Sequence, residues 1–453
     1  MVFWLWWGTF VEAVAWLSGS SLRHTYIYAF PLWLGVIAIA GLAIRRSVWL
    51  SRSTPFLNLF SAFLLLFPMF AMIENSSSLV QERNPASRRP AIVSPAETLP
   101  DIYFIVLDGY GSTRSLRAYW DYDNRTFEDS LRQRGFFVPT RSRANYIHTH
   151  LSMASMLNWD HLLDLHKEAG DGRDRSQTYS MIENNRAARY LKSRGFEFVF
   201  FPTPFRGTSR NRFADRQIPE PPPVTGKLHY VWLAQTPLTP CIYLACWALG
   251  CEARRFPYPP ETANDFEVKF RRLARLPGEP RPKFVLVHVL LPHPPYVFEA
   301  DCTARRATWP ASGDPASWPA VRRGYVGQIQ CLNSMLLQLI DELLKPTGHP
   351  TPIIALQSDH GSGRLQLDPL INKTIPLEEL DPGQIDDRTG IFAAYRFPDG
   401  GAGLYDLITP VNVFPILFNQ LFGDDLPLRE DATYWSEYRR SYLFTRLDPE
   451  GTP

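Results

Sequence analysis

Apolar residues divide the chain into two parts. Three nearly charge-free segments, Val2–Leu17, Tyr26–Ile44 and Pro55–Ile73, come first, whereas the apolar runs after residue 100 are shorter and regularly interrupted. A helix crosses the hydrocarbon core of a bilayer with about 20 apolar residues, and about 17 still suffice. The pattern therefore predicts about three transmembrane helices that form a membrane anchor in residues 1–73.

The first segment is the weakest of these spans, because it is short and contains Glu12. An amphipathic or signal-like segment is the alternative. Trp4, Trp6 and Trp7 suit a membrane interface. A cleaved signal peptide is followed by soluble sequence, but here two further apolar segments follow, which favours an anchor.

Arginines in the short loops predict the orientation. Arg45, Arg46 and Arg52 crowd the loop between the second and third segments, whereas the preceding loop offers Arg23 and His24. Positively charged loops stay on the cytoplasmic side. We therefore expect a multi-pass protein of the cytoplasmic (inner) membrane, with membrane lipids as partners and an extracytoplasmic, periplasmic domain. Residues 74–99, rich in Ser, Pro, Arg and Glu, are the predicted linker.

Short β-rich runs alternate with amphipathic segments from Asp101 onward. The predicted strands are Ile102–Leu107, Glu197–Phe201, Lys283–Leu291, Pro352–Gln357 and Gly390–Phe397. The predicted helices are Ser115–Arg134, Met181–Ser193 and Tyr325–Lys345. Nearly continuous apolar strands separated by helices are typical of an α/β fold with a mostly parallel sheet covered on both faces. This domain is predicted to span residues 100–436, with a tail in residues 437–453.

Composition narrows the function only slightly. A net charge of +2 gives no support to nucleic acid as a partner. Forty prolines and 13% aromatic residues predict long loops around an ordered core. The five cysteines lie in the exported part, where oxidation is permitted. Cys302 and Cys331 could pair, and one of the five must stay unpaired within the chain.

Polar side chains follow two of the predicted strands directly. Asp108 ends the first strand beside Gly109, and Asp359 and His360 follow the fourth. Carboxyl ends of strands in an open α/β sheet converge on one edge, where ligands bind. Carboxylate oxygen and neutral imidazole nitrogen both bind zinc or manganese. The alternatives are an ordinary Asp-Gly turn at Asp108 and a helix-capping Asp359 with an exposed His360.

Thr149 lies where a polar loop runs into a helical pattern of small residues. The N-terminus of a helix favours negative charge, including an ionised hydroxyl or a phosphoryl oxygen. A threonine hydroxyl becomes a useful nucleophile when a base or a metal lowers its pKa. The alternative is that Thr149 only caps the helix. His148 and His150 flank it and are interpreted as exposed loop histidines.

These motifs occur in the same order in sulfatase-like members of the alkaline phosphatase superfamily, which the chain resembles from Leu99 to Tyr434. It looks closest to membrane-anchored branches such as the lipoteichoic acid synthases and the phosphoethanolamine transferases. The resemblance includes Leu291–Tyr296, the helix with Tyr325, Gln328 and Asn333, and Thr409–Asn412. The lipoteichoic acid synthases have a glutamate where this chain has Asp108.

The resemblance implies an alkaline-phosphatase-like fold and assigns roles to individual residues. Thr149 corresponds to the metal-bound nucleophile, and Asp108, Asp359 and His360 correspond to the other ligands of one divalent metal ion. Zinc or manganese is expected, with magnesium or calcium as alternatives. His293 corresponds to a substrate-side histidine that could donate a proton or a hydrogen bond to the reacting phosphate. His288, inside a predicted strand, is interpreted as a core or supporting residue.

The predicted activity is attack of Thr149 on a phosphodiester, either a phospholipid head group or an envelope glycan, through a phosphothreonine intermediate. Water as the acceptor would make the enzyme a hydrolase, and a sugar or lipid hydroxyl would make it a transferase. A sulfuric ester hydrolase is the first alternative, although the C/S-x-P-x-R motif that matures to formylglycine is absent. A catalytically inactive envelope protein that serves in interactions is the second. The oligomeric state is left open.

Overall fold

The computed structural model of the chain describes residues 99–165, 167, 174–218, 261–308, 317–362, 377–438 and 440–448, together with positions 32 and 35. The described residues from 99 onward belong to one compact unit, formed by residues 96–221 and 260–453. The three predicted spans lie outside the described residues except for Leu32 and Gly35, as does the predicted linker except for Leu99. In the described part of the chain, no helix combines the length and the apolar character needed to cross a membrane.

A six-stranded sheet forms the centre of this unit, in the order β3-β2-β4-β1-β7-β8. The strands are β1 (Ile102–Asp108), β2 (Glu197–Phe201), β3 (Arg216–Gln217), β4 (Lys283–Pro292), β7 (Ile353–Ser358) and β8 (Ala393–Arg396). Strand β1 pairs in parallel with β4 and with β7, whereas β8 pairs antiparallel with β7. The predicted α/β fold with a mostly parallel sheet is therefore confirmed.

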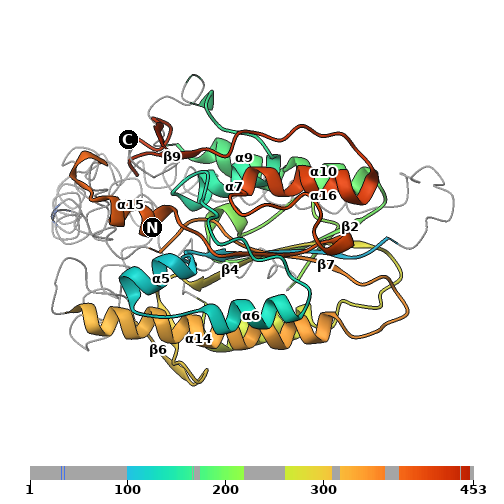
Figure 1. The fold of residues 1–453 in the computed structure, drawn as a ribbon, viewed down its shortest axis with the longest axis horizontal. Coiled ribbons are helices and arrows are strands. Elements are labelled where there is room, and N and C mark those ends of the chain that lie inside the picture. Colours follow the sequence, from blue (N-terminus) through green and yellow to red (C-terminus); the bar gives the residue numbers. More distant parts are fainter. Residues whose placement is uncertain are drawn as a thin grey trace, which may run out of the picture. The chain divides into compact units, whose positions relative to one another are not determined.

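Helices cover both faces of this sheet (Figure 1). One face carries α5 (Thr113–Trp120), α6 (Arg125–Gln133), α13 (Ala263–Leu273) and α14 (Trp318–Leu343). The other carries α7 (Thr149–Asn158), α9 (Ser176–Glu183), α10 (Arg186–Ser193) and α16 (Val413–Phe422). Successive side chains of a strand point to opposite faces. Accordingly, Ile105 of β1 packs in the cluster that contains α14, and Phe104 stacks on Phe414 of α16 with ring centroids 4.7 Å apart.

The remaining described elements are one short helix, two ribbons and short 3₁₀ helices. Helix α15 spans Pro382–Thr389, and one two-stranded ribbon joins β5 (Tyr296–Phe298) to β6 (Ala304–Thr308). A second ribbon joins β9 (Thr433–Trp435) to β10 (Thr445–Leu447). Residues in the predicted tail thus form a strand. Four short 3₁₀ helices span Arg206–Thr208, Leu377–Glu379, Pro398–Gly400 and Pro410–Asn412.

Two predicted helices are wrong as single elements. The segment Ser115–Arg134 is divided into α5 and α6, because Asp121 adopts a left-handed conformation with φ of 49° and ends α5. The segment Met181–Ser193 is divided as well, because the side chain of Asn185 accepts a hydrogen bond from Ala188 N and begins α10. Short polar side chains that end or cap helices outweigh the apolar periodicity at both places.

A disulfide joins Cys302 to Cys331, as the sequence allowed, with a Cα–Cα distance of 4.8 Å. Cys331 is buried in the middle of α14, and Cys302 lies in the turn between β5 and β6. The bond therefore ties the segment that follows β4 to the helix beneath the sheet.

Candidate metal centre

Three neighbouring strands bring polar side chains to one edge of the sheet. Asp108 is the last residue of β1, Asp359 directly follows β7, and His293 directly follows β4. Because β1 lies between β4 and β7, the loops after these strands meet. Gly109 N donates to Asp359 Oδ1 at 3.0 Å, and His293 N donates to the carbonyl of Asp108 at 3.1 Å. The backbone itself thus fixes the three loops relative to one another.

Ligand atoms of Asp108, His288 and Asp359 lie within 4.8 Å of one another, and all three residues are buried. Asp108 Oδ1, Asp359 Oδ2 and His288 Nε2 have no hydrogen-bond partner among the described residues. A buried polar atom without a partner costs roughly 1–3 kcal/mol. Three such atoms that converge in one place fit a divalent cation, which would satisfy all of them.

His360 completes this cluster. Its Nε2 lies 3.3 Å from Asp359 Oδ2 and 3.6 Å from Asp108 Oδ1. Its Nδ1–H donates to the carbonyl of Gly361 at 2.9 Å, which leaves the lone pair on Nε2. Burial, and then the charge of Arg388, hold the pKa of His360 well below its usual value. The ring is therefore neutral, the form in which imidazole binds a metal.

The two carboxylates are electrostatically costly without a cation. Burial raises the pKa of Asp108 well above its ordinary value, and the neighbouring Asp359 raises it further, whereas Arg388 opposes the shift. Two buried carboxylates cannot both ionise at low cost unless positive charge lies between them. Carboxylates with neutral imidazoles form a donor set that suits zinc or manganese.

Thr149 is the first residue of α7, and its Oγ1 lies 3.2 Å from His360 Nε2. His148, with extended backbone, occupies the capping position, so Thr149 is not the cap that the alternative interpretation required. The first N–H groups of a helix have no partners within the helix, and they attract anions. The structure therefore brings Asp108, Thr149, Asp359 and His360 together.

His148 and His150 are buried, so their interpretation as exposed loop histidines is wrong. Their exposed fractions are 5% and 2%. His148 Nε2 lies 2.9 Å from the carbonyl of Ser436, and His150 Nδ1 lies 3.1 Å from Thr178 Oγ1. The physical reason is that the chain after β9 packs over this loop, with the Tyr438 ring 5.6 Å from that of His148.

His288 lies closer to the two carboxylates of the candidate metal centre than the sequence predicted. It is fully buried inside β4, its Nδ1 lies 3.0 Å from Thr208 Oγ1, and its Nε2 lies 3.7 Å from Asp108 Oδ2. Burial lowers its pKa to about 3, so the ring is neutral. The relation depends on the parallel pairing of β1 with β4, in which Val106 faces His288 in register. A core or supporting residue was expected, and a candidate ligand was found.

His293 lies beside this cluster rather than inside it. Its Nδ1 donates to the carbonyl of Pro294 at 2.6 Å, which makes Nε2 the lone-pair nitrogen of the neutral ring. Burial lowers the pKa of His293. A neutral ring in this tautomer accepts a proton at Nε2 and does not donate one there.

Arg388 was not identified from the sequence. It lies near the end of α15 with 6% exposed, and its guanidinium donates to the carbonyl of Ile147 and, at 3.4 Å, to that of Gly361. Gly361 N donates in return to the carbonyl of Arg388 at 2.8 Å. Burial lowers the pKa of Arg388 to about 10. Arg388 therefore ties the loop before Thr149 to the loop that contains His360.

Helix α14 supports the same edge from below. Tyr325 OH donates to the carbonyl of Gly109 at 2.7 Å, and Gly111 N donates to Tyr325 OH at 3.1 Å. Gln328 Oε1 accepts from Val297 N at 2.8 Å, and its Nε2 donates to the carbonyl of His293 at 3.2 Å. These bonds fix the turn after Asp108 and the turn that carries His293.

No family model and no curated protein matches the chain. Solved structures are similar to it. The C-terminal periplasmic domain of EcEptC from Escherichia coli, in complex with zinc, has 12% identity and a TM-score of 0.47, covering 79% of this chain and 94% of that one. The soluble domain of lipooligosaccharide phosphoethanolamine transferase A from Neisseria meningitidis has 12% identity and a TM-score of 0.43, covering 73% and 90%.

A protein in the alkaline phosphatase superfamily from Vibrio parahaemolyticus has 13% identity and a TM-score of 0.41, covering 75% of this chain and 73% of that one. One of these neighbours is named as a phosphoethanolamine transferase and another as a member of the alkaline phosphatase superfamily, the groups that the sequence motifs resemble.

Proposed function

We propose that the chain is a metal-dependent enzyme that cleaves phosphate esters, with Thr149 as its nucleophile. The observation that carries the proposal is the short distance from Thr149 Oγ1 to His360 Nε2, 3.2 Å, beside Asp108 Oδ1 and Asp359 Oδ2, two oxygens without a hydrogen-bond partner in the described part of the chain. A hydroxyl at a helix N-terminus beside buried carboxylates and a neutral imidazole is arranged for activation by a cation.

Asp108, Thr149, Asp359 and His360 would hold one divalent ion, with zinc or manganese preferred to magnesium or calcium because of the imidazole. His288 Nε2, 3.7 Å from Asp108 Oδ2, is a further candidate donor. Such an ion, when bound, lowers the pKa of a hydroxyl and offsets charge on phosphate oxygens.

The proposed reaction has two displacements at phosphorus. The Thr149 hydroxyl gives its proton to solvent, and its Oγ bonds to phosphorus while the bond between phosphorus and the leaving oxygen breaks. The leaving oxygen takes up a proton and departs as an alcohol. The oxygen of water or of an acceptor hydroxyl then bonds to phosphorus while the bond between Thr149 Oγ and phosphorus breaks, and Thr149 Oγ takes up a proton from solvent. The unpaired N–H groups at the start of α7 would bind a nonbridging phosphate oxygen.

His293 is proposed as a substrate-binding residue that acts in the second displacement. Because its Nδ1–H is bonded to the carbonyl of Pro294, Nε2 accepts a proton rather than donating one. Its pKa is lowered by burial, which keeps that nitrogen free of a proton at neutral pH. His293 would therefore take the proton of the attacking water or hydroxyl.

The predicted anchor suggests where the substrate is. Three transmembrane helices in residues 1–73 would hold the catalytic unit outside the cytoplasmic membrane, within reach of phospholipid head groups and envelope glycans. A tether raises the effective concentration of such groups. We propose a phosphodiester from one of these two classes as the substrate.

The test uses the full chain, purified in detergent, with bis-4-nitrophenyl phosphate as substrate and 4-nitrophenyl sulfate for comparison. Thr149→Ala should lower metal-dependent phosphodiester cleavage by about a thousandfold or more, because it removes the nucleophile. Asp359→Asn should lower it similarly through loss of the cation. Trapping of a 4-nitrophenyl phosphoryl group on Thr149, located by mass spectrometry, identifies the intermediate.

Two matched control variants test whether a substitution of the same type lowers activity wherever it is made. Thr126→Ala and Asp425→Asn change exposed residues of the same types and should keep full activity. Cleavage that survives Thr149→Ala would overturn the role of Thr149. Faster cleavage of the sulfate ester than of the phosphodiester would favour the sulfuric ester hydrolase instead.

A further inference from the structure

A second group of charged side chains borders a cavity of about 480 Å³ at the start of α5. Its described lining comes from the first two turns of α5, from α6, from the loop after α6 and from the residues before β8. These residues are Ser112, Thr113, Arg114, Arg117, Ala118, Arg125, Glu128, Pro139, Thr140, Ile391 and Phe392. None of them belongs to the metal cluster, so the cavity is a separate feature.

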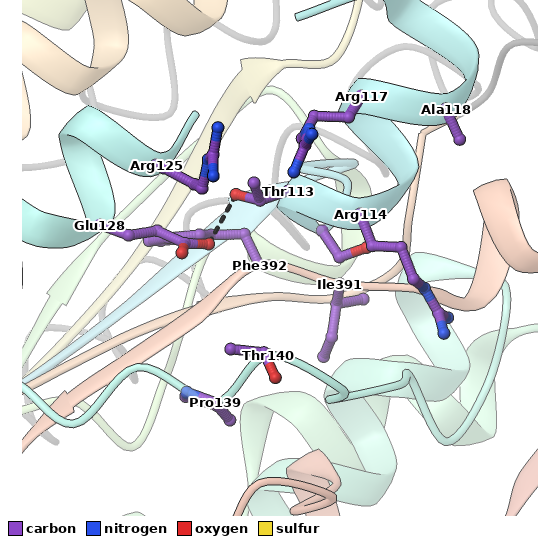
Figure 2. Close-up of a pocket in the computed structure, with 11 residues that line it drawn as sticks. Thr113, Arg114, Arg117, Ala118, Arg125, Glu128, Pro139, Thr140, Ile391 and Phe392 are labelled. Carbon is purple, nitrogen blue, oxygen red and sulfur yellow. Dashed lines mark hydrogen bonds between the residues drawn. The ribbon is translucent and has the colours of Figure 1, made fainter. Parts of the chain in front are cut away.

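Arg117 and Arg125 share one carboxylate. Arg117 Nε lies 3.9 Å from Asp123 Oδ2, and Arg125 Nη2 lies 2.6 Å from the same oxygen. The two guanidiniums flank the hydrogen bond from Thr113 to Glu128 in Figure 2. Both are more than half exposed, at 54% and 60%, so a ligand from solvent can reach them.

The lining itself carries more positive than negative charge. Its charged residues are Arg114, Arg117 and Arg125 against the single acidic residue Glu128. Glu128 already accepts from Thr113 Oγ1 at 2.5 Å and pairs with Arg132 at 3.2 Å. The formal charge of the lining is therefore positive.

The lining also has apolar residues. Ala118 is exposed, whereas Pro139, Ile391 and Phe392 are buried and form the floor beneath the charged side chains. The Phe392 ring is held against Tyr110, with centroids 4.6 Å apart, and against Phe127 at 5.5 Å. Cavities that bind small organic ligands measure roughly 300–1,000 Å³, so this one has room for more than a bare ion.

We infer that this cavity binds the phosphate group of a small organic phosphate, with its organic part against Ala118, the exposed apolar residue of the lining. Guanidinium groups bind phosphate through paired, charge-assisted hydrogen bonds. Exposed ion pairs such as Arg117–Asp123 contribute little, so an incoming dianion competes with them at low cost. The inference does not depend on the proposed function.

The test is calorimetric titration of the full chain in detergent with glycerol 3-phosphate. The protein keeps its metal, and any phosphate binding at the metal centre is the binding that remains in the cavity variant. The double variant Arg117→Gln/Arg125→Gln should weaken binding by about tenfold or more. Arg271→Gln, which also removes an exposed arginine with a carboxylate partner, should leave affinity unchanged.

The same titration is repeated with inorganic phosphate and with dihexanoyl phosphatidic acid. Tighter binding of phosphatidic acid than of glycerol 3-phosphate would identify a lipid head group as the source of the phosphate, and equal binding would identify a soluble ester. No binding of glycerol 3-phosphate, binding no tighter than that of inorganic phosphate, or equal affinity in the double variant would each overturn the inference. Arg117→Gln alone serves if the double variant fails to fold.

Discussion

The candidate metal centre buries its charged side chains, whereas the arginine-lined cavity leaves its charged side chains exposed. At the metal centre, Asp108 and Asp359 are buried, and each has an oxygen without a partner among the described residues. At the cavity, Arg117 and Arg125 are exposed and already share Asp123. Backbone hydrogen bonds from neighbouring loops fix the first group, whereas the second consists of long side chains on helix surfaces.

The difference indicates how each region depends on its ligand. Buried carboxylates are poorly solvated, so a cation at this site would stabilise the fold. Exposed guanidiniums are solvated and screened, so the cavity is stable with or without an anion. Changes at the metal centre should therefore affect the stability of the whole unit, and changes at the cavity should affect binding alone.

Metal removal should have the largest effect, and it should depend on pH. Because burial raises the pKa of Asp108, the metal-free fold gains stability from its protonated form. That gain is complete below the ordinary value of 3.8 and is lost as pH rises through the raised pKa. A cation at a thousand times its dissociation constant adds about 4 kcal/mol. The Tm difference between metal-loaded and EDTA-treated chain should therefore grow from pH 4 to pH 7, and a constant difference would contradict this.

Gly361→Ala should be the most damaging single substitution for stability. A Cβ at this position would lie 2.3 Å from the carbonyl of Asp387 and 2.7 Å from that of Gly390, so the loops around His360 would have to separate. We expect a loss of about 3 kcal/mol in the free energy of unfolding, measured with urea. Gly111→Ala is the matched control, because its Cβ would meet no atom closer than 3.6 Å. Equal losses in the two variants would refute the packing argument.

Gln328→Leu should lower the free energy of unfolding by less, about 2 kcal/mol, because it leaves buried polar groups of the turn that contains His293 without partners. Gln328 is fully buried and bonds to Val297 N and to the carbonyls of Pro292 and His293. If this residue positions His293, kcat should fall more than stability alone explains, with metal content unchanged. Unchanged kcat in folded Gln328→Leu would show that the bonds serve stability only.

Arg117→Gln should change the free energy of unfolding least, within about 0.5 kcal/mol, because the ion pair of Arg117 is exposed. Urea unfolding of the variant and of the wild type measures this change in the free energy of unfolding. A loss as large as that of Gln328→Leu would mean that the cavity is part of the folded core and would remove the contrast between the two regions.

The parts of the site that could be predicted are those that strand ends define. An apolar run that stops at Asp108, and another that stops before Asp359 and His360, gave the sheet edge and the ligand types without any tertiary information. Thr149 could be placed at a helix start because the polar loop changes there to small residues. The strand boundaries followed from the same runs, and β1, β2, β4 and β7 begin and end within one residue of expectation.

The rest depends on contacts between distant segments. His288 became a candidate ligand only through the register of β4 against β1, and Arg388 only through the packing of α15 against two loops. His148 and His150 are buried because the chain after β9 covers them. The break between α5 and α6 rests on the left-handed backbone of Asp121, which apolar periodicity does not reveal.

The most direct test of the central claim is metal content. The full chain, stripped with EDTA, dialysed against excess zinc and then against buffer, is measured by mass spectrometry beside Asp359→Asn and Asp425→Asn. The account predicts a tightly held ion in wild type and in the exposed-residue control Asp425→Asn, and its loss in Asp359→Asn. Equal metal content in all three proteins, or none in wild type, would contradict it.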